Sequence, residues 1–447
     1  MANGCAMKHS AIVIGGGIAG LSAAHHLSAR GIGVTVLEAS ERVGGRMTSE
    51  RHDGFVIDRG AQFVSDGYTV VADLIDTLGL SAQVHGVPGW TGIVRGGKVR
   101  RIHPRRPWTL PSSGLLRWKD AVRTTRASLK LAHDARDLPL NDYAGWRPLD
   151  REDAAHALAE RFGTDALEYL FEPMLEGFYF QPPEGTALAL PAMVWSFGAR
   201  GKSVSALRGG MGVLPETLAT RLDVRLSSPA VSIESGATGV QVATPHGTFR
   251  ADFAVLATTA GVARGLCSPV DEDAARLLDT RYSATVNISL GIPAGIPSAP
   301  SVEDIYAVLI PRRERRVLAA FAFQSRKYPD QAGRGELLNV MLDGAAGARL
   351  IGASESDVMA EVIPELERYL PGVASRIGFA RIHRWLEAEP CSLPGRATHL
   401  HAYRQKWRAD RRVVLAGDYM GIPCTEGAAE SGRWAAAQIA GALAGNA

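Results

Sequence analysis

Two short segments at opposite ends of the chain constrain its fold more than any other feature. Near the N-terminus, the apolar run 11–14 leads into three consecutive glycines beginning at Gly15, with Gly20 shortly after. Near the C-terminus, the apolar run 413–416 ends on a glycine and Asp418. Short apolar runs that stop at glycine predict buried parallel strands. Because such sheets bind ligands at the carboxyl ends of their strands, the pair predicts one long dinucleotide held by both ends of the chain, which usually means FAD.

The first of these segments has the layout of a βαβ nucleotide-binding unit. Residues 19–29 predict a helix, and the next apolar run predicts a second strand that ends on Glu38. Gly15 and Gly17 allow the backbone to approach a pyrophosphate, and Gly20 allows the helix to pack on the strand. A carboxylate at Glu38 accepts both ribose hydroxyls and repels a 2′-phosphate, which disfavours NADP. The alternative is a glycine-rich turn that binds nothing.

Composition limits the classes of protein that the chain can belong to. A length of 447 residues predicts at least two domains, and an apolar content of 46% with 21% charged residues is ordinary for a globular enzyme. A net charge of +3 does not favour nucleic acid as a partner. The cysteines form no CxxC pair and the histidines show no metal spacing, so we expect a reduced, cytoplasmic protein without disulfides or a metal site. No apolar run reaches the ~20 residues of a membrane-spanning helix.

The middle of the chain shows no repeat and no low-complexity linker. Residues 90–100 predict a hairpin that turns at a Gly-Gly pair, and residues 115–136, 151–170 and 354–369 predict helices. Composition therefore marks no domain boundary, which is typical of a chain that crosses between two domains several times.

A second glycine pair follows the predicted βαβ unit directly. Gly44 and Gly45 precede Arg46, a few residues beyond Glu38. The glycines offer a second close backbone approach to phosphate, and the guanidinium supplies positive charge. Taken alone, the segment could also be an ordinary exposed loop.

Together with the end segments, this loop resembles the flavin amine oxidases, phytoene desaturases and protoporphyrinogen oxidases. The matching stretches are residues 12–20, 42–49, 54–63, 208–215, 254–258, 415–418 and 425–436. The resemblance implies an α/β fold in which a discontinuous, Rossmann-type FAD-binding domain carries an inserted α+β substrate-binding domain. We expect the FAD-binding domain to comprise residues 8–85, 205–275 and 385–447. We expect the substrate-binding domain to comprise residues 86–204 and 276–384.

The resemblance also implies a set of cofactor contacts. The backbone of Val231 would bond adenine, and Asp418 would meet the ribityl chain or pyrophosphate. The helix beginning near Gly427 would point its N-terminus at the flavin pyrimidine, where its dipole stabilises the anion of the reduced ring. The complete set of predicted cofactor-binding residues is Gly15, Gly17, Gly20, Glu38, Gly45, Arg46, Val231, Gly417, Asp418, Gly427 and Ala428.

The branch within this superfamily is less well determined by the sequence. Related amine oxidases commonly carry a lysine near the flavin N5, where this chain has Asn287, and no lysine lies between Lys202 and Lys327. The cysteine motif of the covalently flavinylated members is also missing, so we expect non-covalent FAD. Residues 172–179 and 384–390 resemble segments of protoporphyrinogen oxidases, and this favours that branch, although both segments could simply be core.

A basic segment occupies residues 95–130, which contain eleven Lys or Arg and a single acid, Asp120. Leu115, Trp118, Val122, Leu129 and Ala132 fall on one helical face, apart from the basic residues. One interpretation is a surface that attracts carboxylated substrates or anionic lipid headgroups, which allows peripheral membrane association. The other is a solvated basic face.

We therefore expect an FAD-dependent oxidoreductase that acts on a small molecule. It would remove a hydride from a substrate C–H, leave a C=C or C=N bond, and be reoxidised by O2 or another acceptor. Alternatives are a flavin amine oxidase that releases peroxide and a non-catalytic binding protein on the same fold. Because the cofactor carries the chemistry, no residue is named as catalytic. Gln62, Tyr179 and Tyr419 are candidates for the pocket wall, and the oligomeric state is left open.

Overall fold

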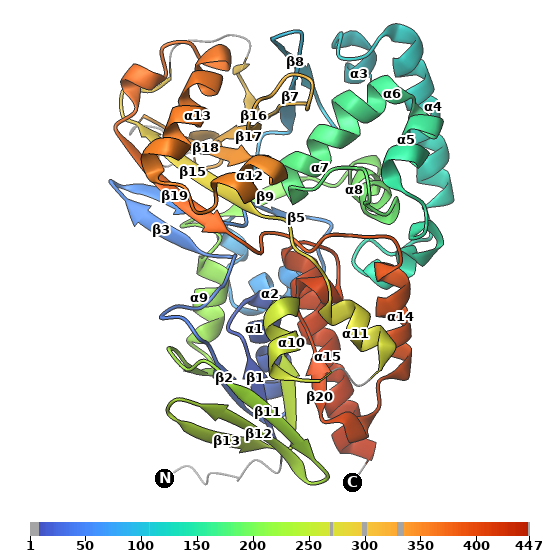
Figure 1. Ribbon diagram of the computed structural model, residues 1–447, viewed down its shortest axis with the longest axis vertical. Helices are drawn as coiled ribbons and strands as arrows, with labels where there is room; N and C mark the ends of the chain where they lie inside the picture. The colour runs from blue at the N-terminus through green and yellow to red at the C-terminus, as the bar shows by residue number, and fades with distance from the viewer. Residues whose placement is uncertain (1–8, 107, 269–270, 297–301, 329–334, 446–447) are drawn as a thin grey trace.

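The computed structural model describes residues 9–106, 108–268, 271–296, 302–328 and 335–445. Residue 8, where the predicted FAD-binding domain begins, and Cys5 lie outside these ranges. The chain forms two parts stacked along the long axis of the molecule, and the first and last described residues lie in the lower part (Figure 1).

A parallel five-stranded sheet forms the centre of the lower part. The strands lie in the order β10-β2-β1-β14-β20. Their bounds are β10 Asp223–Arg225, β2 Gly33–Leu37, β1 Ser10–Ile14, β14 Phe253–Leu256 and β20 Val413–Leu415. Residues Ala11 to Ile14 are all buried, as expected for a strand covered on both faces. The two end segments of the chain therefore lie in one sheet, separated only by β14.

Two helices, one from each end of the chain, pack against each other beside this sheet. Helix α1, Ile18–Ser28, packs against α15, Thr425–Gly445. A Cβ on Gly432 of α15 would lie 2.0 Å from the Ala19 carbonyl oxygen, so only glycine allows this close crossing. The Ser22 hydroxyl also donates to the Ala429 carbonyl at 2.8 Å. The other helices of this part are α2 Val70–Thr77, α9 Val213–Ala219, α10 Ala260–Leu266, α11 Glu272–Leu278 and α14 Arg396–Lys406.

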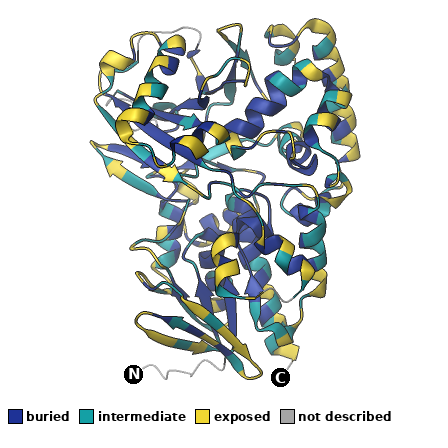
Figure 2. Cartoon of the chain, viewed as in Figure 1, coloured by how far each residue is buried: buried dark blue, intermediate teal, exposed yellow. Residues whose placement is uncertain are grey.

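A seven-stranded sheet forms the centre of the upper part. Its strands lie in the order β19-β15-β18-β17-β16-β7-β8, and all neighbours are antiparallel except β16 and β7. Their bounds are β19 Phe379–Trp385, β15 Thr285–Ile292, β18 Glu336–Leu342, β17 Leu318–Phe323, β16 Ile305–Leu309, β7 Trp90–Arg95 and β8 Lys98–Ile102. Every residue of β15 and β17 is buried, as Figure 2 shows for the interior of this part. Helices α12, Gly344–Leu350, and α13, Glu355–Tyr369, contribute to the same core.

The remaining helices of the upper part lie beyond this sheet. They are α3 Thr109–Ser112, α4 Trp118–Asp134, α5 Ala154–Phe162, α6 Thr164–Ala166, α7 Glu172–Tyr179 and α8 Ala189–Ala199, with a π-helical turn at Leu167–Phe171. The predicted helices at 115–136 and 354–369 and the predicted hairpin at 90–100 are confirmed. The predicted helix at 151–170 is broken after α5, where Gly163 adopts a φ of +95°.

Helix α4 buries one side and exposes some of its apolar residues to solvent. Ala121, Thr124 and Leu131 form its buried side. Trp118 and Leu129, from the apolar set identified in the sequence, are 70% and 69% exposed. The amphipathic pattern of the sequence therefore marks a surface of α4 that faces solvent.

Three smaller sheets complete the fold. Their strands are β3 Ser49–His52 with β4 Phe55–Asp58; β5 Val64–Ser65, β9 Val204–Leu207 and β6 Val84–Gly86; and β11 Ser232–Gly236, β12 Gly239–Thr244 and β13 Gly247–Ala251. None of the helices in the described ranges is both long enough and apolar enough to cross a bilayer.

Candidate cofactor and substrate site

The glycine-rich turn after β1 combines tight packing with an open approach. Gly15 has a φ of +106°, and its Cβ would lie 2.6 Å from the Ala257 carbonyl oxygen. A Cβ on Gly20 would lie 1.9 Å from the Gly15 carbonyl oxygen, which fixes the start of α1 against the turn. Gly17 differs, because nothing lies within 4 Å of the position of its Cβ. It is also the N-cap of α1, and no side chain in the described part of the chain caps it, so the first amides of the helix are available to an anion.

The second strand and the following loop close over this turn. Glu38 accepts the Gly16 N–H at 2.6 Å through one carboxylate oxygen, and the Ser40 N–H at 2.8 Å through the other. The Gly44 N–H donates to the Gly16 carbonyl at 2.8 Å, and Gly45, with a φ of +55°, lies beside Gly17. The predicted ribose and phosphate residues are therefore adjacent. The bond from Gly16 to Glu38 also holds this carboxylate in place.

Arg46 and Asp418 link the two end segments directly. Their ion pair is 2.6 Å long, and Asp418 is 6% exposed. Burial alone would lower the pKa of Arg46, but Asp418 and then Tyr282 raise it above its usual value, so the guanidinium stays charged. The Tyr282 hydroxyl donates to the second oxygen of Asp418 at 2.8 Å and accepts the Ala260 N–H at 3.3 Å. Sequence reasoning predicted the arginine and the aspartate and missed the tyrosine between them.

The N-terminus of α15 completes the site. Gly417 adopts a φ of +137°, and its N–H donates to the Ser431 hydroxyl at 2.9 Å, inside α15. A Cβ on Gly427 would lie 2.2 Å from the Ile422 carbonyl oxygen, so only glycine fits there. The Ala428 N–H, in the first turn of α15, donates to the carbonyl of Cys424. The helix begins at Thr425, two residues before the predicted start near Gly427.

Two side chains near this helix start have roles that the sequence did not reveal. Burial raises the pKa of the Cys424 thiol to about 12, although the Gly427 N–H and the Tyr68 hydroxyl lower it. Glu426 is fully buried and caps α2, because its carboxylate accepts the N–H groups of Val70 and Val71 at 2.9 Å each. The sequence motif around Gly427 predicted the helix start, but it does not indicate the structural roles of Cys424 and Glu426.

Val231 lies near the ribose end of the site. The Ser228 N–H donates to the Glu38 carbonyl at 2.8 Å, which brings this segment beside β2. The Val231 N–H already donates to the Ala243 carbonyl at 2.9 Å. Its carbonyl therefore remains as the predicted backbone partner for adenine.

The three predicted pocket residues have different surroundings. Tyr179 is half-buried beside Cys424 and Glu389; burial, and next Cys424, raise the pKa of its hydroxyl well above the usual value. Gln62 is half-buried, but its amide nitrogen donates to the Asp58 and Gly60 carbonyls at 3.2 and 2.9 Å. Tyr419 is fully buried, and its place in the pocket wall stays a prediction. Its ring packs close to Gly417, where a Cβ would lie 2.8 Å from the ring.

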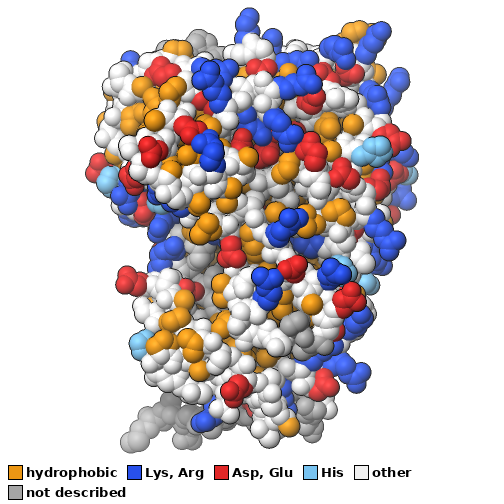
Figure 3. Space-filling view, in the orientation of Figure 1, with side chains coloured by type: hydrophobic (Ala, Val, Ile, Leu, Met, Phe, Trp, Pro, Cys, Tyr) orange, Lys and Arg blue, Asp and Glu red, His pale blue; other side chains and the backbone are white. Residues whose placement is uncertain are grey.

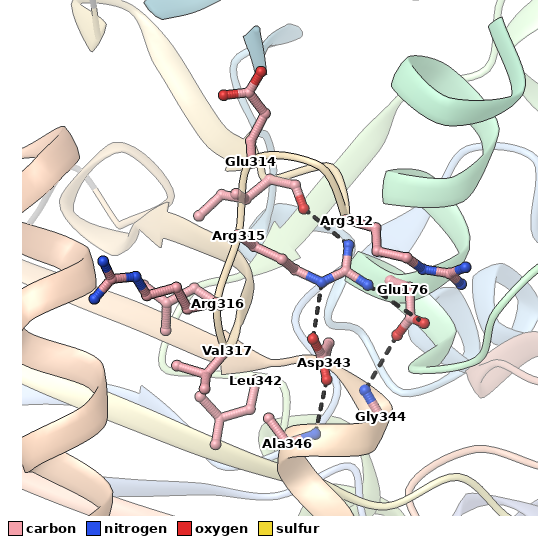
Figure 4. A network of polar contacts seen from close by, with 12 residues as sticks. Glu176, Arg312, Glu314, Arg315, Arg316, Val317, Leu342, Asp343, Gly344 and Ala346 are labelled. Atoms are coloured by element: carbon pink, nitrogen blue, oxygen red, sulfur yellow. Dashed lines mark hydrogen bonds and ion pairs between the residues drawn. The ribbon is translucent and has the colours of Figure 1, made fainter. Parts of the chain in front are cut away.

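Helix α7, which ends at Tyr179, is held by a buried arginine (Figure 4). Arg315 is ion-paired with Glu172 of α7 at 2.8 Å and donates to Asp343 at 2.8 Å. Glu176, one turn along α7, accepts the Gly344 N–H at 3.1 Å. Burial raises the pKa of Glu172 and of Glu176, although Arg315 lowers both. This cluster fixes α7 against β17 and α12, and it thereby positions Tyr179.

A second buried cluster surrounds Asp58 at the end of β4. Its carboxylate accepts the Ser49 hydroxyl at 2.5 Å, the Met211 N–H at 2.8 Å and the Tyr328 hydroxyl at 2.5 Å. The Lys327 ammonium, which is fully buried, forms an ion pair with the same carboxylate. Lys327 follows β17 in the upper part, so the cluster ties the two parts of the fold together. Lys327 also lies 3.4 Å from the Gln62 side-chain oxygen.

Asn287 occupies the place where the sequence resemblance leads one to expect a lysine. Its side-chain nitrogen donates to the Arg59 carbonyl at 3.1 Å, and its buried side-chain oxygen has no hydrogen-bond partner among the residues that the structure describes. The Trp385 indole donates to the same carbonyl at 2.8 Å. Asn287 therefore braces the segment after Asp58 and leaves one acceptor free.

These observations fit an FAD molecule. Three features lie in succession along one site. They are the uncapped helix start beside the open face of Gly17, the charged Arg46 with Asp418, and a second helix start at Thr425. Helix N-termini and guanidinium groups bind phosphates, whereas the second helix start favours negative charge on a reduced ring.

Comparison with known proteins agrees with this site. Residues 18–440 match the family of flavin containing amine oxidoreductases. The chain is 26% identical over 455 residues to coproporphyrinogen III oxidase of Mycobacterium tuberculosis, covering 93% of this chain and 95% of that protein. It is 32% identical over 177 residues to coproporphyrinogen III oxidase of Propionibacterium freudenreichii, which covers 38% of this chain and 31% of that protein.

Two solved structures share the fold over nearly the whole chain. A putative protoporphyrinogen oxidase from Exiguobacterium sp. 255-15 has a TM-score of 0.77 and 21% identity, covering 98% of this chain and 99% of that one. Cyclohexylamine oxidase from Brevibacterium oxydans IH-35A has a TM-score of 0.75 and 20% identity, with the same coverage. The α/β fold with a Rossmann-type FAD domain is confirmed. The chain therefore belongs to the flavin-containing amine oxidoreductase family and is an FAD-dependent oxidoreductase.

Proposed function

We propose that this enzyme oxidises a porphyrinogen, a reduced tetrapyrrole, at a C–H bond of a methylene bridge between two pyrrole rings. Bound FAD supplies the chemistry by accepting a hydride from the substrate, and O2 is the proposed acceptor for its reoxidation. The relatives that align with almost the whole chain include coproporphyrinogen III oxidases and a chloroplastic protoporphyrinogen oxidase. That full-length likeness carries the proposal.

The residues around the site support the same branch. Asn287 stands where amine oxidases commonly carry a lysine, and Lys327 is engaged by Asp58. Helix α7 and the segment after β19, which resemble parts of protoporphyrinogen oxidases, meet at the site, because the Ser283 hydroxyl donates to the carbonyls of Tyr179 and Glu389. A flavin amine oxidase remains the second candidate, supported by the likeness of the fold to cyclohexylamine oxidase.

An anaerobic reduction experiment tests the proposal. The purified holoenzyme is mixed with coproporphyrinogen III, protoporphyrinogen IX, putrescine or cyclohexylamine, and the flavin absorbance is followed. We expect a porphyrinogen to bleach the flavin and form a fluorescent porphyrin, and O2 to restore the absorbance with release of peroxide. If only the amines bleach the flavin, the result favours the second candidate, a flavin amine oxidase. If light reduces the flavin but none of the four compounds does, both candidates fail.

We also propose specific boundaries and contacts for the cofactor domain. Residues 8–85, 205–275 and 385–447 would bind FAD, and the two intervening segments would bind substrate. The placement of the five-stranded sheet in the first three ranges and of the seven-stranded sheet almost entirely in the other two supports this division. Along the cofactor, Gly17 and Arg46 would contact the pyrophosphate, and the first turn of α15 would face the pyrimidine of a non-covalently bound flavin.

A peripheral contact with anionic membranes is a separate proposal. Trp118 and Leu129 of α4 are exposed, and so are Lys119, Arg123 and Lys130 of the same helix. Lys and Arg side chains are frequent along the upper right edge of the molecule, where α3 and α4 lie (Figure 3). Apolar anchors next to basic residues suit the interface of an anionic bilayer. We place the protein in the cytoplasm, where the free thiols of Cys267, Cys391 and Cys424 would be maintained.

Vesicle sedimentation distinguishes this surface from a solvated basic face. We expect the enzyme to co-sediment with phosphatidylserine vesicles at low salt and not with phosphatidylcholine vesicles. The variant Trp118→Ser/Leu129→Ser should lose binding and keep its activity. Val262→Ser, which changes another exposed apolar residue, serves as the control. Equal binding by the wild type and the double variant, or no binding to either vesicle, would remove the membrane proposal.

A further inference from the structure

Helix α7 exposes a single residue, and that residue is aromatic. From Glu172 to Gly177 every residue of α7 is buried, and Tyr179 at its end is half-buried. Phe178, between them, is 38% exposed. A phenyl ring that stays open on an otherwise enclosed helix loses the free energy that its burial would supply. The surroundings of the ring decide whether it is an ordinary surface residue or a contact for a ligand.

The ring of Phe178 packs against Phe63, which comes from a distant segment of the chain. Phe63 lies between β4 and β5 and is half-buried. The two ring centroids are 5.9 Å apart and the ring planes are inclined at 87°, an edge-to-face arrangement that aromatic pairs prefer. Because only one edge and one face meet in such a pair, each ring keeps at least one face for another group. The pair therefore joins α7 to the segment after β4 and still offers aromatic surface.

The segment that carries Phe63 is bonded directly to the arginine of the cofactor site. The Ala61 N–H, two residues before Phe63, donates to the Arg46 carbonyl at 2.9 Å. A Cβ on Gly60 would lie 2.3 Å from the same carbonyl oxygen, so only glycine allows the segment to pass this close. Arg46 in turn pairs with Asp418. The backbone that carries Phe63 therefore lies beside the predicted cofactor contacts.

The end of α7 that carries Phe178 is connected to the same arginine by three hydrogen bonds. The Ser283 hydroxyl donates to the Tyr179 carbonyl at 2.9 Å. The Ala388 N–H donates to the Ser283 carbonyl at 2.8 Å, and the Arg46 guanidinium donates to the Ala388 carbonyl at 2.8 Å. Both members of the aromatic pair are therefore positioned relative to Arg46, one from each side of the site.

The C-terminal end of α7 is held in an unusual conformation. Its C-cap, Phe180, has a φ of +54°, in the left-handed region that is unfavourable for residues other than glycine. A Cβ on Gly344 would lie 2.2 Å from the Phe180 carbonyl oxygen, so the close contact there requires glycine. Arg315, through its ion pair with Glu172, holds the start of the helix. Such backbone conformations persist only where packing imposes them, and they cluster at ligand sites. The direction in which α7 presents Phe178 is therefore fixed in advance.

We propose that Phe178 is a specificity-determining residue whose exposed ring packs against a pyrrole ring of the substrate, while Phe63 holds the phenyl ring in place. The inference rests on the proposed function and deepens it, because it assigns the contact that selects an aromatic macrocycle. In a porphyrinogen, the saturated bridges incline neighbouring pyrrole rings to one another, as the two phenyl rings of the pair are inclined. Small aliphatic amines such as putrescine offer no aromatic surface to this pair.

The binding of a porphyrin that is not turned over tests this contact. Coproporphyrin III is added to the oxidised holoenzyme, and its Kd is measured by the anisotropy of the porphyrin fluorescence. We expect Phe178→Ala to raise the Kd by about tenfold, as the loss of one aromatic contact and its buried area predicts. Phe178→Tyr keeps the ring and should bind like the wild type, and Phe178→Leu should lie between these two variants. Trp108→Ala is the matched control, because it removes another exposed aromatic ring, at the start of α3, and should bind like the wild type.

Steady-state kinetics with coproporphyrinogen III separate a lost substrate contact from general damage to the site. Phe178→Ala should raise KM by a factor similar to that in Kd and leave kcat within about twofold, because the ring contacts the ground state and the transition state alike. Its flavin content and melting temperature should match those of the wild type. Phe63→Ala should also raise Kd and KM. Because Phe63 acts through Phe178, the double variant should lose less than the product of the two single effects.

The outcomes distinguish this inference from the proposed function. If Phe178→Ala binds coproporphyrin III and uses coproporphyrinogen III as the wild type does, the inference is overturned, while turnover by the wild type still supports the proposed function. No binding of coproporphyrin III to the wild type would overturn the inference as well. If the two single effects multiply in the double variant, Phe63 does not hold the ring. If the wild type binds coproporphyrin III through Phe178 but no porphyrinogen reduces its flavin, the proposed function fails and the aromatic contact stands.

Discussion

The buried ion pair of Lys327 and Asp58 allows a specific prediction about the free energy of unfolding. Both side chains are fully enclosed, and they join the segment after β17 to the end of β4. Replacing Lys327 with methionine keeps most of the volume but leaves a buried carboxylate without its counter-charge. Removing one partner of a buried pair typically costs about 3–5 kcal/mol. Because Ser49, Met211 and Tyr328 still donate to Asp58, we expect the lower end of this range, about 3 kcal/mol.

Urea unfolding, followed by tryptophan fluorescence, measures this loss. The variant Lys327→Met/Asp58→Asn should be more stable than Lys327→Met, because the neutral amide needs no counter-charge and can still accept the Met211 N–H. Arg349→Met is the matched control, since Arg349 pairs with Glu361 at 2.6 Å on the surface. An exposed pair of this kind contributes less than about 1 kcal/mol. If Lys327→Met unfolds like the control, or if the double variant is no more stable than Lys327→Met, the reasoning about this cluster is refuted.

Three further outcomes follow from the site. Gly20→Val should abolish FAD retention, because its Cβ would lie 1.9 Å from the Gly15 carbonyl; normal flavin content after purification would contradict this. Tyr282→Phe removes the 2.8 Å bond to Asp418 and should weaken FAD binding by about tenfold in Kd, measured by flavin fluorescence, as a lost hydrogen bond of about 1.4 kcal/mol predicts. Burial raises the pKa of Glu176 above its usual 4.5, so the stability that the protonated carboxyl contributes is present below pH 4.5 and is lost as the pH rises. The melting temperature of Glu176→Gln should therefore fall less with rising pH than that of the wild type. Parallel falls in the two proteins would refute this reasoning.

Local sequence patterns predicted the parts of the site that depend on spacing alone. The turn at Gly15, the tight contact at Gly20 and the carboxylate at Glu38 all follow from one βαβ unit of fixed geometry. The end segments also predicted that Asp418 would join this unit. Their direct ion pair through Arg46 confirms that the two ends meet, although only the structure gives its distance.

Residues that meet through long-range packing left no such signal. Tyr282 and Glu389 lie on different segments of the chain and reach the site only because β15 pairs with β19. Tyr419 follows the predicted Asp418 directly, yet it turns into the core and is fully buried. The apolar stripe on α4 shows the same limit, because periodicity identifies a face and the surrounding helices decide whether it is buried.

The identity and attachment of the flavin test the central claim most directly. Purified enzyme, or enzyme reconstituted with FAD, is precipitated with acid, and the flavin in the supernatant and in the pellet is identified and counted per chain. The account predicts one FAD per chain, all of it in the supernatant, since the site fits a dinucleotide held without a covalent bond. FMN in place of FAD, flavin that stays with the pellet, or no flavin after reconstitution would contradict it.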